Sequence, residues 1–139
     1  MTYFLDANII SYVIKNIPSV ISRIQDLIKD GADVRIPIVS YYEVKRGLLA
    51  NKASNKLAIF DTQIKALGLV QMTEQTFDLA ALIYSQLKQS GNLIEDADLF
   101  IGASALENNA VLITNNANHL QRIPNLKIEV IKKKKYIAY

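Results

Sequence analysis

Short apolar runs separated by segments with helical spacing are the feature that most constrains the fold of this chain. The runs are typical of buried strands, and they cover residues 3–5, 34–38, 67–70, 111–113 and 128–131. Strands that are joined through a helix usually lie parallel in one sheet. The alternation therefore predicts an α/β fold, a three-layer sandwich in which a mostly parallel sheet of roughly five strands is flanked by helices.

Helical spacing is clearest in three segments between these runs, residues 20–28, 57–67 and 77–87, where apolar side chains recur three and four positions apart. Thr73 before Glu74 is typical of a helix start, and Gly91 is typical of a helix end. The start and end signals agree with the spacing of the third segment.

The length of the chain limits the number of domains. With 139 residues, half of them hydrophobic, the chain can form one domain with a substantial core. We expect a single domain over residues 1–131 and a basic tail over residues 132–139. No apolar run is long enough for a membrane span, and no secretory signal pattern opens the chain, so we expect a soluble, cytoplasmic protein.

The chain has no cysteine and one histidine. Disulfides, thiolate nucleophiles, cysteine-type zinc sites and histidine-rich metal cages are therefore excluded. Any metal ion in this protein must be held mainly by oxygen ligands.

The basic character of the chain lies mostly in four consecutive lysines, 132–135. Without them, 12 of the 16 basic residues remain against 13 acidic ones, so the rest of the chain is close to neutral. The lysine run could contact phosphate groups or simply keep the protein in solution, and the sequence leaves both open.

Polar side chains follow several of the predicted strands. Asp6 comes after the first strand and Asn116 after the fourth, while Glu43 lies in the expected first turn of a helix beginning "SYYEVKRG". Asp98 lies at the start of the helix "IEDADLFIGASA". Because ligands bind at the carboxyl ends of parallel strands, these residues are expected to converge on one edge of the sheet.

Each acid also has a purely structural explanation. Ser40 and Glu43 fit a capping box, and Glu95, Asp96 and Asp98 suit the first turn of a helix through its dipole. The combination favours a site, because the small residues after Asp98 must pack tightly and would fix that helix end in place. Several carboxylates in one cleft repel each other unless a hard divalent cation such as Mg²⁺ or Mn²⁺ binds them.

Four segments, in this order, carry a family resemblance: "FLDANIIS" (4–11), "YYEVKRGL" (41–48), "IEDADLFIGASAL" (94–106) and "VLITNNANHLQRIPNLKIE" (111–129). Over nearly its whole length the chain resembles the PIN-domain ribonucleases, and among them the VapC-type toxins of bacterial toxin–antitoxin pairs.

The resemblance implies a PIN-like fold and places the catalytic positions of the family at Asp6, Glu43, Asp98 and Asn116, with Asp6, Asp98 and Glu43 as metal ligands. It implies an endoribonuclease that uses Mg²⁺ or Mn²⁺ to hydrolyse RNA phosphodiesters, leaving a 5′-phosphate and a 3′-hydroxyl. It also implies a small antitoxin that inserts into the acidic cleft, and a toxin homodimer.

The chain departs from the family pattern in two places near these acids. Ala7 stands where the family commonly has threonine or serine, so a hydroxyl beside the first aspartate is expected to be missing. Asp96 adds an acid two residues before Asp98, on another helix face, and is only a peripheral candidate. His119 is left out of the catalytic set, because a metal-activated water needs no separate base.

Residues around Glu43 have alternative interpretations. Arg46 could pair with Glu43 at three-residue spacing or, with Lys45, meet RNA phosphates. Three tyrosines could stack on bases, although packing in the core or in a dimer is favoured for them: Tyr12, Tyr41 and Tyr42.

Two other functional classes remain as alternatives. A phosphoacceptor receiver domain could use Thr114, but it needs an aspartate after its central strand, and the candidate strands end in "PIVS" and "LVQM" without one. A catalytically silent PIN-fold module that only binds an antitoxin is disfavoured by the intact Asp6, Glu43 and Asp98. A metal-binding titration would separate it from an enzyme.

Overall fold

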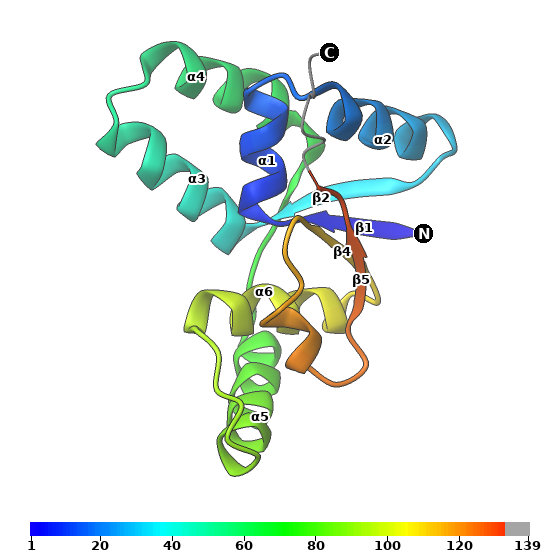
Figure 1. Cartoon of the computed structure of the whole chain (residues 1–139), viewed down its shortest axis with the longest axis vertical. Helices are drawn as coiled ribbons and strands as arrows, with labels where there is room; N and C mark the ends of the chain where they lie inside the picture. The colour runs from blue at the N-terminus through cyan, green and yellow to red at the C-terminus, as the bar shows by residue number, and fades with distance from the viewer. Residues whose placement is uncertain (133–139) are drawn as a thin grey trace, which may run out of the picture.

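The computed structural model describes residues 1–132, and in these residues a five-stranded sheet lies between two layers of helices (Figure 1). The strands are β1 (Thr2–Leu5), β2 (Asp33–Pro37), β3 (Leu69–Val70), β4 (Val111–Thr114) and β5 (Lys127–Val130). Their order is β3-β2-β1-β4-β5, and every pairing is parallel. The predicted three-layer α/β sandwich is confirmed.

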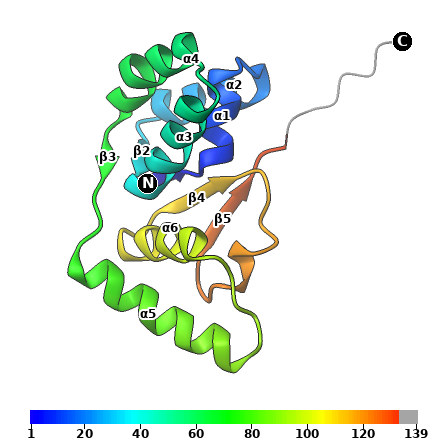
Figure 2. The ribbon, with the colours of Figure 1, turned by 90° about the vertical axis from the view of Figure 1, so that its left-hand side faces the viewer.

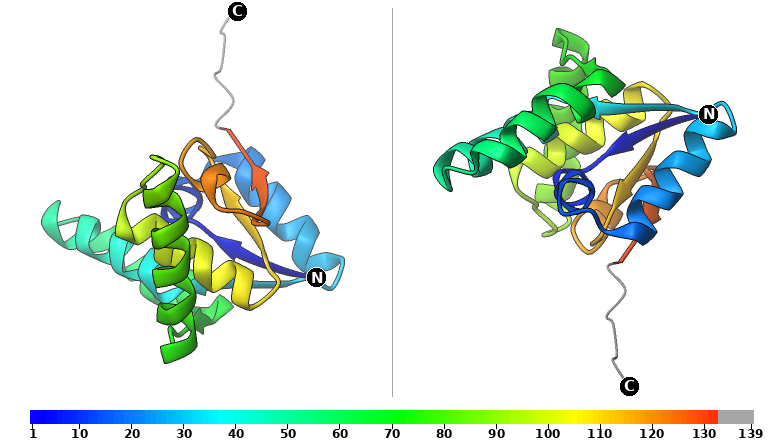
Figure 3. Two further views of the ribbon diagram at one scale, coloured as in Figure 1. Left: turned by 90° about the horizontal axis from the view of Figure 1, so that it is seen from below. Right: turned by 90° about the horizontal axis from the view of Figure 1, so that it is seen from above.

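Helices cover both faces of the sheet, as the two opposite views of Figure 3 show. One layer holds α1 (Ala7–Ile14), α2 (Pro18–Lys29), α3 (Ile38–Ala50) and α4 (Ser54–Ile59), and the other holds α5 (Glu74–Gln89) and α6 (Asp96–Glu107). Each layer has its own core: Ile10 and Ile36 belong to the first, and Leu99 and Leu112 to the second. Within residues 1–132, no helix has both the length and the apolar character to cross a bilayer.

The order of the strands creates a switch point between β1 and β4. From β1 the chain proceeds outward to β2 and β3 through the first helix layer, and then returns through α5 and α6 to β4 on the other side of β1 (Figure 2). The backbone N–H of Asp6 donates to Ile113 O at 2.9 Å, which extends the β1–β4 pairing past the end of β1. In sheets of this order, ligands bind at the carboxyl ends of the strands next to the switch point, so the ends of β1 and β4 are the expected place for a ligand crevice.

The start of α3 corrects one prediction. The helix begins at Ile38, with Pro37 as its N-cap residue, so Glu43 lies in the second turn and not in the first. The predicted capping box of Ser40 and Glu43 is wrong: Ser40 is buried inside the helix, and its hydroxyl has no hydrogen-bond partner among residues 1–132. Pro37 is the last residue of β2, where it pairs with Val70 of β3, and its φ of −57° and ψ of 140° make it the residue that precedes the helix. It has no N–H to donate to a further ladder bond.

The segment after α4 differs from the single helix predicted over residues 57–67. The chain passes from α4 into a π-helical turn, Phe60–Ile64, and a 3₁₀ turn, Lys65–Leu67. Thr62 donates its hydroxyl to Ala58 O at 2.8 Å, a side-chain bond that competes with regular helix pairing. By contrast, the predicted start of α5 is confirmed, because the Thr73 side chain accepts from the Thr76 N–H.

The small-residue stretch of α6 allows the close packing that the sequence predicts. Residues 101–105 are all buried, and a Cβ at Gly102 would collide with Cδ1 of Ile123. Gly102 therefore lets α6 lie directly beneath the connection between β4 and β5.

We predict that Gly102→Ala lowers the free energy of unfolding by up to about 2 kcal/mol, because the cost of overpacking against buried Ile123 exceeds the gain in helix propensity. Ile123→Val removes the colliding atom, so the same alanine should be less costly in that background. Urea unfolding of the single and double variants measures both effects.

Gly47→Ala in α3 is the matched control, because a Cβ there meets no atom within 4 Å. It should raise stability by up to about 1 kcal/mol. If Gly102→Ala is as harmless as Gly47→Ala, the packing argument is wrong.

Candidate active site at the carboxyl edge of the sheet

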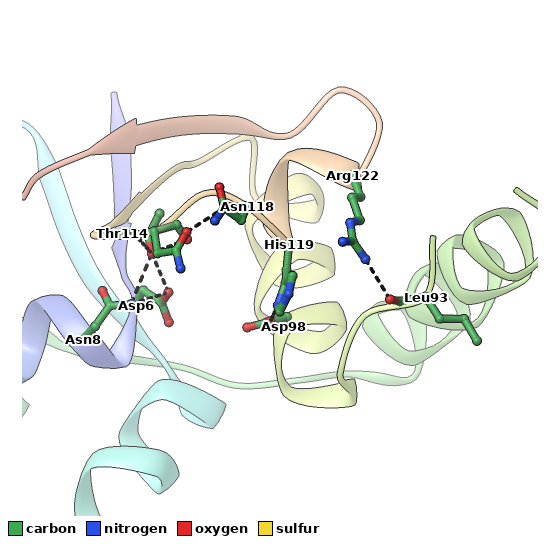
Figure 4. A network of polar contacts seen from close by, with 9 residues as sticks. Asp6, Asn8, Leu93, Asp98, Thr114, Asn118, His119 and Arg122 are labelled. Carbon is green, nitrogen blue, oxygen red and sulfur yellow. Dashed lines mark hydrogen bonds and ion pairs between the residues drawn. The ribbon is translucent and has the colours of Figure 1, made fainter. Parts of the chain in front are cut away.

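Asp6 is the buried centre of the candidate site, with only 6% of its surface exposed. It is the N-cap residue of α1: Oδ1 accepts the Ala7 N–H at 2.8 Å. Oδ2 accepts the Thr114 hydroxyl at 2.8 Å and Nδ2 of Asn8 at 3.2 Å (Figure 4). Burial raises the pKa of Asp6, and these three hydrogen bonds offset part of the rise.

Thr114 and Asn8 are site residues that sequence reasoning missed. Asn8 accepts the Asn115 N–H on Oδ1 at 3.0 Å, so it ties the start of α1 to the segment after β4. The hydroxyl expected to be missing at Ala7 is supplied by Thr114 from the neighbouring strand. Thr114 lies 108 residues from Asp6, and only the pairing of β1 with β4 reveals the contact.

Glu43 and Asp98 face the same space as Asp6 from α3 and α6. The pKa of Glu43 is raised, first by burial and then by the negative charge of Asp6, with smaller contributions from Asp98 and Glu95. The pKa of Asp98 is raised by burial and by Asp6 in the same way. The structure therefore brings together the three acids that the sequence singled out, and it adds the charge of Glu95 at the N-cap of α6.

In the first turn of α6, the side chains of Asp98 and Asp96 have different neighbours. Asp98 lies 3.6 Å from Nδ1 of His119, measured to Oδ2, and Figure 4 shows the two side chains together. His119 is attached to a loop that Arg122 fastens to Leu93 O by a 3.0 Å hydrogen bond. Asp96 instead borders a hollow with residues of α5, which agrees with its assignment as peripheral.

Asn116 lies beside the acids but turns its amide oxygen into its own loop. Its Oδ1 accepts the Asn118 N–H at 3.0 Å, and its backbone N–H and carbonyl both lie 3.3 Å from the Thr114 hydroxyl oxygen. Asn116 is thus joined to Asp6 through a single side chain, that of Thr114.

The chemistry of the site suits a divalent cation. In residues 1–132, no three acidic or histidine side chains already lie close enough together to hold a metal ion. However, Asp6, Glu43 and Asp98 all offer carboxylate oxygens, and the charge of Asp6 raises the pKa of both other acids, a repulsion that a hard cation would relieve. Binding of one ion by all three would draw their side chains together.

Comparisons with known proteins give a family match over most of the chain. The PIN domain family model matches residues 3–126. Ribonuclease VapC2 of Rickettsia felis is 29% identical over 133 residues, which cover 93% of this chain and 97% of that protein. Ribonuclease VapC1 of Haemophilus influenzae strain R2866 is 31% identical over 129 residues, which cover 91% of this chain and 96% of that protein.

Solved structures with the same fold include VapBC2 from Rickettsia felis bound to a DNA fragment from its promoter. It has a TM-score of 0.85 and 28% identity, and the match covers 95% of this chain and all of that chain. VapBC-1 from nontypeable Haemophilus influenzae has a TM-score of 0.82 and 28% identity, with coverage of 94% and 98%.

The raised pKa values predict how the metal-free protein responds to pH. An acid whose pKa is higher in the folded than in the unfolded state binds more protons when folded, so stability rises as pH falls through the raised pKa. Glu43→Gln should therefore unfold at a higher temperature than the parent at about pH 7.5, and the difference should shrink at about pH 5.

Asp78→Asn, which changes an exposed acid on α5, is the control and should follow the parent at both pH values. A Glu43→Gln protein that is less stable than the parent at neutral pH would contradict the repulsion argument.

Proposed function

Because the chain belongs to the PIN domain family, we propose that it is a divalent-metal-dependent endoribonuclease of the VapC type, acting as the toxin of a toxin–antitoxin pair. The observation that carries the proposal is the convergence of Asp6, Glu43 and Asp98 at the switch point between β1 and β4. Mg²⁺ or Mn²⁺ is the expected ion, since all three ligands are hard carboxylate oxygens.

In this proposal the protein side chains have distinct roles. Asp6 is the central ligand, and Thr114 and Asn8 hold its Oδ2 in a fixed direction through their hydrogen bonds. Glu43 and Asp98 complete the ligand set from α3 and α6. When bound, the metal supplies a nucleophilic water at neutral pH and neutralises charge on the leaving oxygen. Asn116 contributes a neutral amide at the rim of this site.

We further propose that a small cognate antitoxin covers the acidic site and that the toxin forms a homodimer. Two solved structures with the same fold, each 28% identical to this chain, are VapBC2 from Rickettsia felis and VapBC-1 from nontypeable Haemophilus influenzae, and this likeness supports a partner protein. The contribution of the lysine tail beyond Lys132 lies outside the described residues.

A catalytically silent binding module is the second candidate function. The carboxylate cluster argues against it, because a module that binds only a partner protein gains nothing from mutually repelling acids in a half-buried crevice. Calorimetric titration with Mn²⁺ separates the two, since the silent module should bind no metal at the site.

We predict that Asp6→Asn and Asp98→Asn each reduce metal-dependent RNA cleavage by at least about a hundredfold. Each change removes one carboxylate charge from the proposed metal ligands, and a bound metal stabilises the transition state by several kcal/mol. Cleavage of a labelled RNA, with and without a chelator, and growth after induction measure the effect.

Asp96→Asn is the matched control, because Asp96 lies two residues from Asp98 but borders the hollow next to α5. It should keep near-parental activity. Parental cleavage rates in both Asp6→Asn and Asp98→Asn would rule out the assigned ligands.

A further prediction concerns Asn116, whose amide oxygen is a poorer ligand for a hard cation than a carboxylate. Asn116→Asp should shift the metal activation curve to lower concentration. It should also lower the thermal midpoint of the metal-free protein, and Mg²⁺ should restore that midpoint.

Asn118→Asp adds the same charge two residues along the loop and should leave the activation curve unchanged. Identical curves for Asn116→Asp and the parent would place Asn116 outside the metal site.

A further inference from the structure

Two adjacent tyrosines of α3 have very different surroundings. Tyr41 stacks on Phe60, with ring centroids 5.3 Å apart and an interplanar angle of 27°, and it packs against the first core. Tyr42 is 58% exposed, although it directly precedes Glu43. The expected packing of Tyr41 is confirmed, but among the described residues no core contact accounts for Tyr42.

A cation lies beside the exposed ring. The guanidinium carbon of Arg46, one helical turn further along α3, is 5.2 Å from the centroid of the Tyr42 ring. The Arg46 side chain is 59% exposed, and its Nη2 lies 3.8 Å from Oε2 of Glu43. This ion pair is too long to be a hydrogen bond. The Arg46 guanidinium therefore lies close both to the aromatic ring and to a carboxylate of the site.

We propose that Tyr42 and Arg46 form a nucleotide-binding platform beside the active site, on which a base of single-stranded RNA stacks while the guanidinium contacts a neighbouring phosphate. The inference rests on the proposed ribonuclease function and names a substrate contact for it. Stacking on an aromatic ring tolerates every base, and the planar guanidinium fits phosphate oxygens with paired donors.

The position on α3 explains why the platform would serve this substrate. Consecutive residues on a helix point in different directions, so Glu43 can face the other acids while Tyr42 stays exposed next to it. RNA bound through its backbone needs positive charge near the acids, and Arg46 supplies it at the point where Glu43 would otherwise repel phosphate.

A protein partner is the competing occupant, because exposed Leu49 lies two turns along the helix from Tyr42. Tyrosine and arginine are common in protein interfaces as well, so the residue types alone do not separate the two occupants. The place of Arg46 favours RNA, because its guanidinium lies 3.8 Å from a carboxylate of the site, where it can offset the repulsion between that acid and a phosphate.

The test measures binding of a fluorescent single-stranded RNA to Asp6→Asn protein, which should bind without cutting. In this background Tyr42→Ala should weaken binding by about 5- to 100-fold, and Tyr42→Phe should not. Arg46→Ala should also weaken binding and flatten its salt dependence by about one phosphate contact.

Tyr84→Ala, which removes a 40% exposed tyrosine from α5, is the matched control and should bind RNA like its parent. A fluorescent base analogue in the RNA reports stacking directly: its quenching should be lost in Tyr42→Ala and kept in Tyr42→Phe.

Unchanged RNA affinity in Tyr42→Ala overturns the inference. If light scattering also shows a changed molecular mass, Tyr42 belongs to an interface between protein chains. The proposed ribonuclease function fails separately, if the wild-type protein neither cuts RNA with metal nor binds the labelled strand.

Discussion

The parallel pairing of β1 with β4 places Asp6 next to Thr114, which ends β4 and lies 108 residues further along the chain. At this junction the Thr114 hydroxyl and the Asn8 amide both donate to one carboxylate oxygen of Asp6. A buried carboxylate is strongly destabilising unless such donors compensate for its lost hydration. The helices on either side are arranged around this fixed charge, since α1 begins on Asp6 and α3 and α6 each direct an acid toward it.

The acids around Asp6 lower the stability of the metal-free protein, although the proposed metal-dependent function requires them. The charge of Asp6 raises the pKa of Glu43 and Asp98, which weakens the metal-free fold at neutral pH, and a divalent cation that binds only the folded state would reverse the effect. Tight packing elsewhere keeps the ligand-bearing elements in place. Buried Gly102 lets α6 approach the loop after β4, and the bond from Arg122 to Leu93 O fastens that loop to the segment before α6.

Helix α3 connects the proposed chemistry to substrate binding. Its inner side packs against the first core through Val44, Glu43 faces the other acids, and Tyr42 with Arg46 remains exposed. One helix therefore presents a proposed metal ligand, a flat ring and a cation within about two turns. This arrangement explains why neighbouring tyrosines with similar sequence contexts need separate interpretations.

Local sequence patterns determined the fold class and the alternation of strands and helices, because these are encoded by nearby residues. The same patterns made Asp6, Glu43 and Asp98 the candidate site acids. The tertiary structure decided what depends on contacts between distant segments. It supplied the hydroxyl of Thr114 in place of the one missing at Ala7, and it left Tyr42 exposed while it covered Tyr41. It also corrected the start of α3, where Pro37 ends β2 and the helix begins before Ser40. The physical reason is that hydrogen bonds and burial across a sheet depend on strand order, and no local spacing in the sequence carries that information.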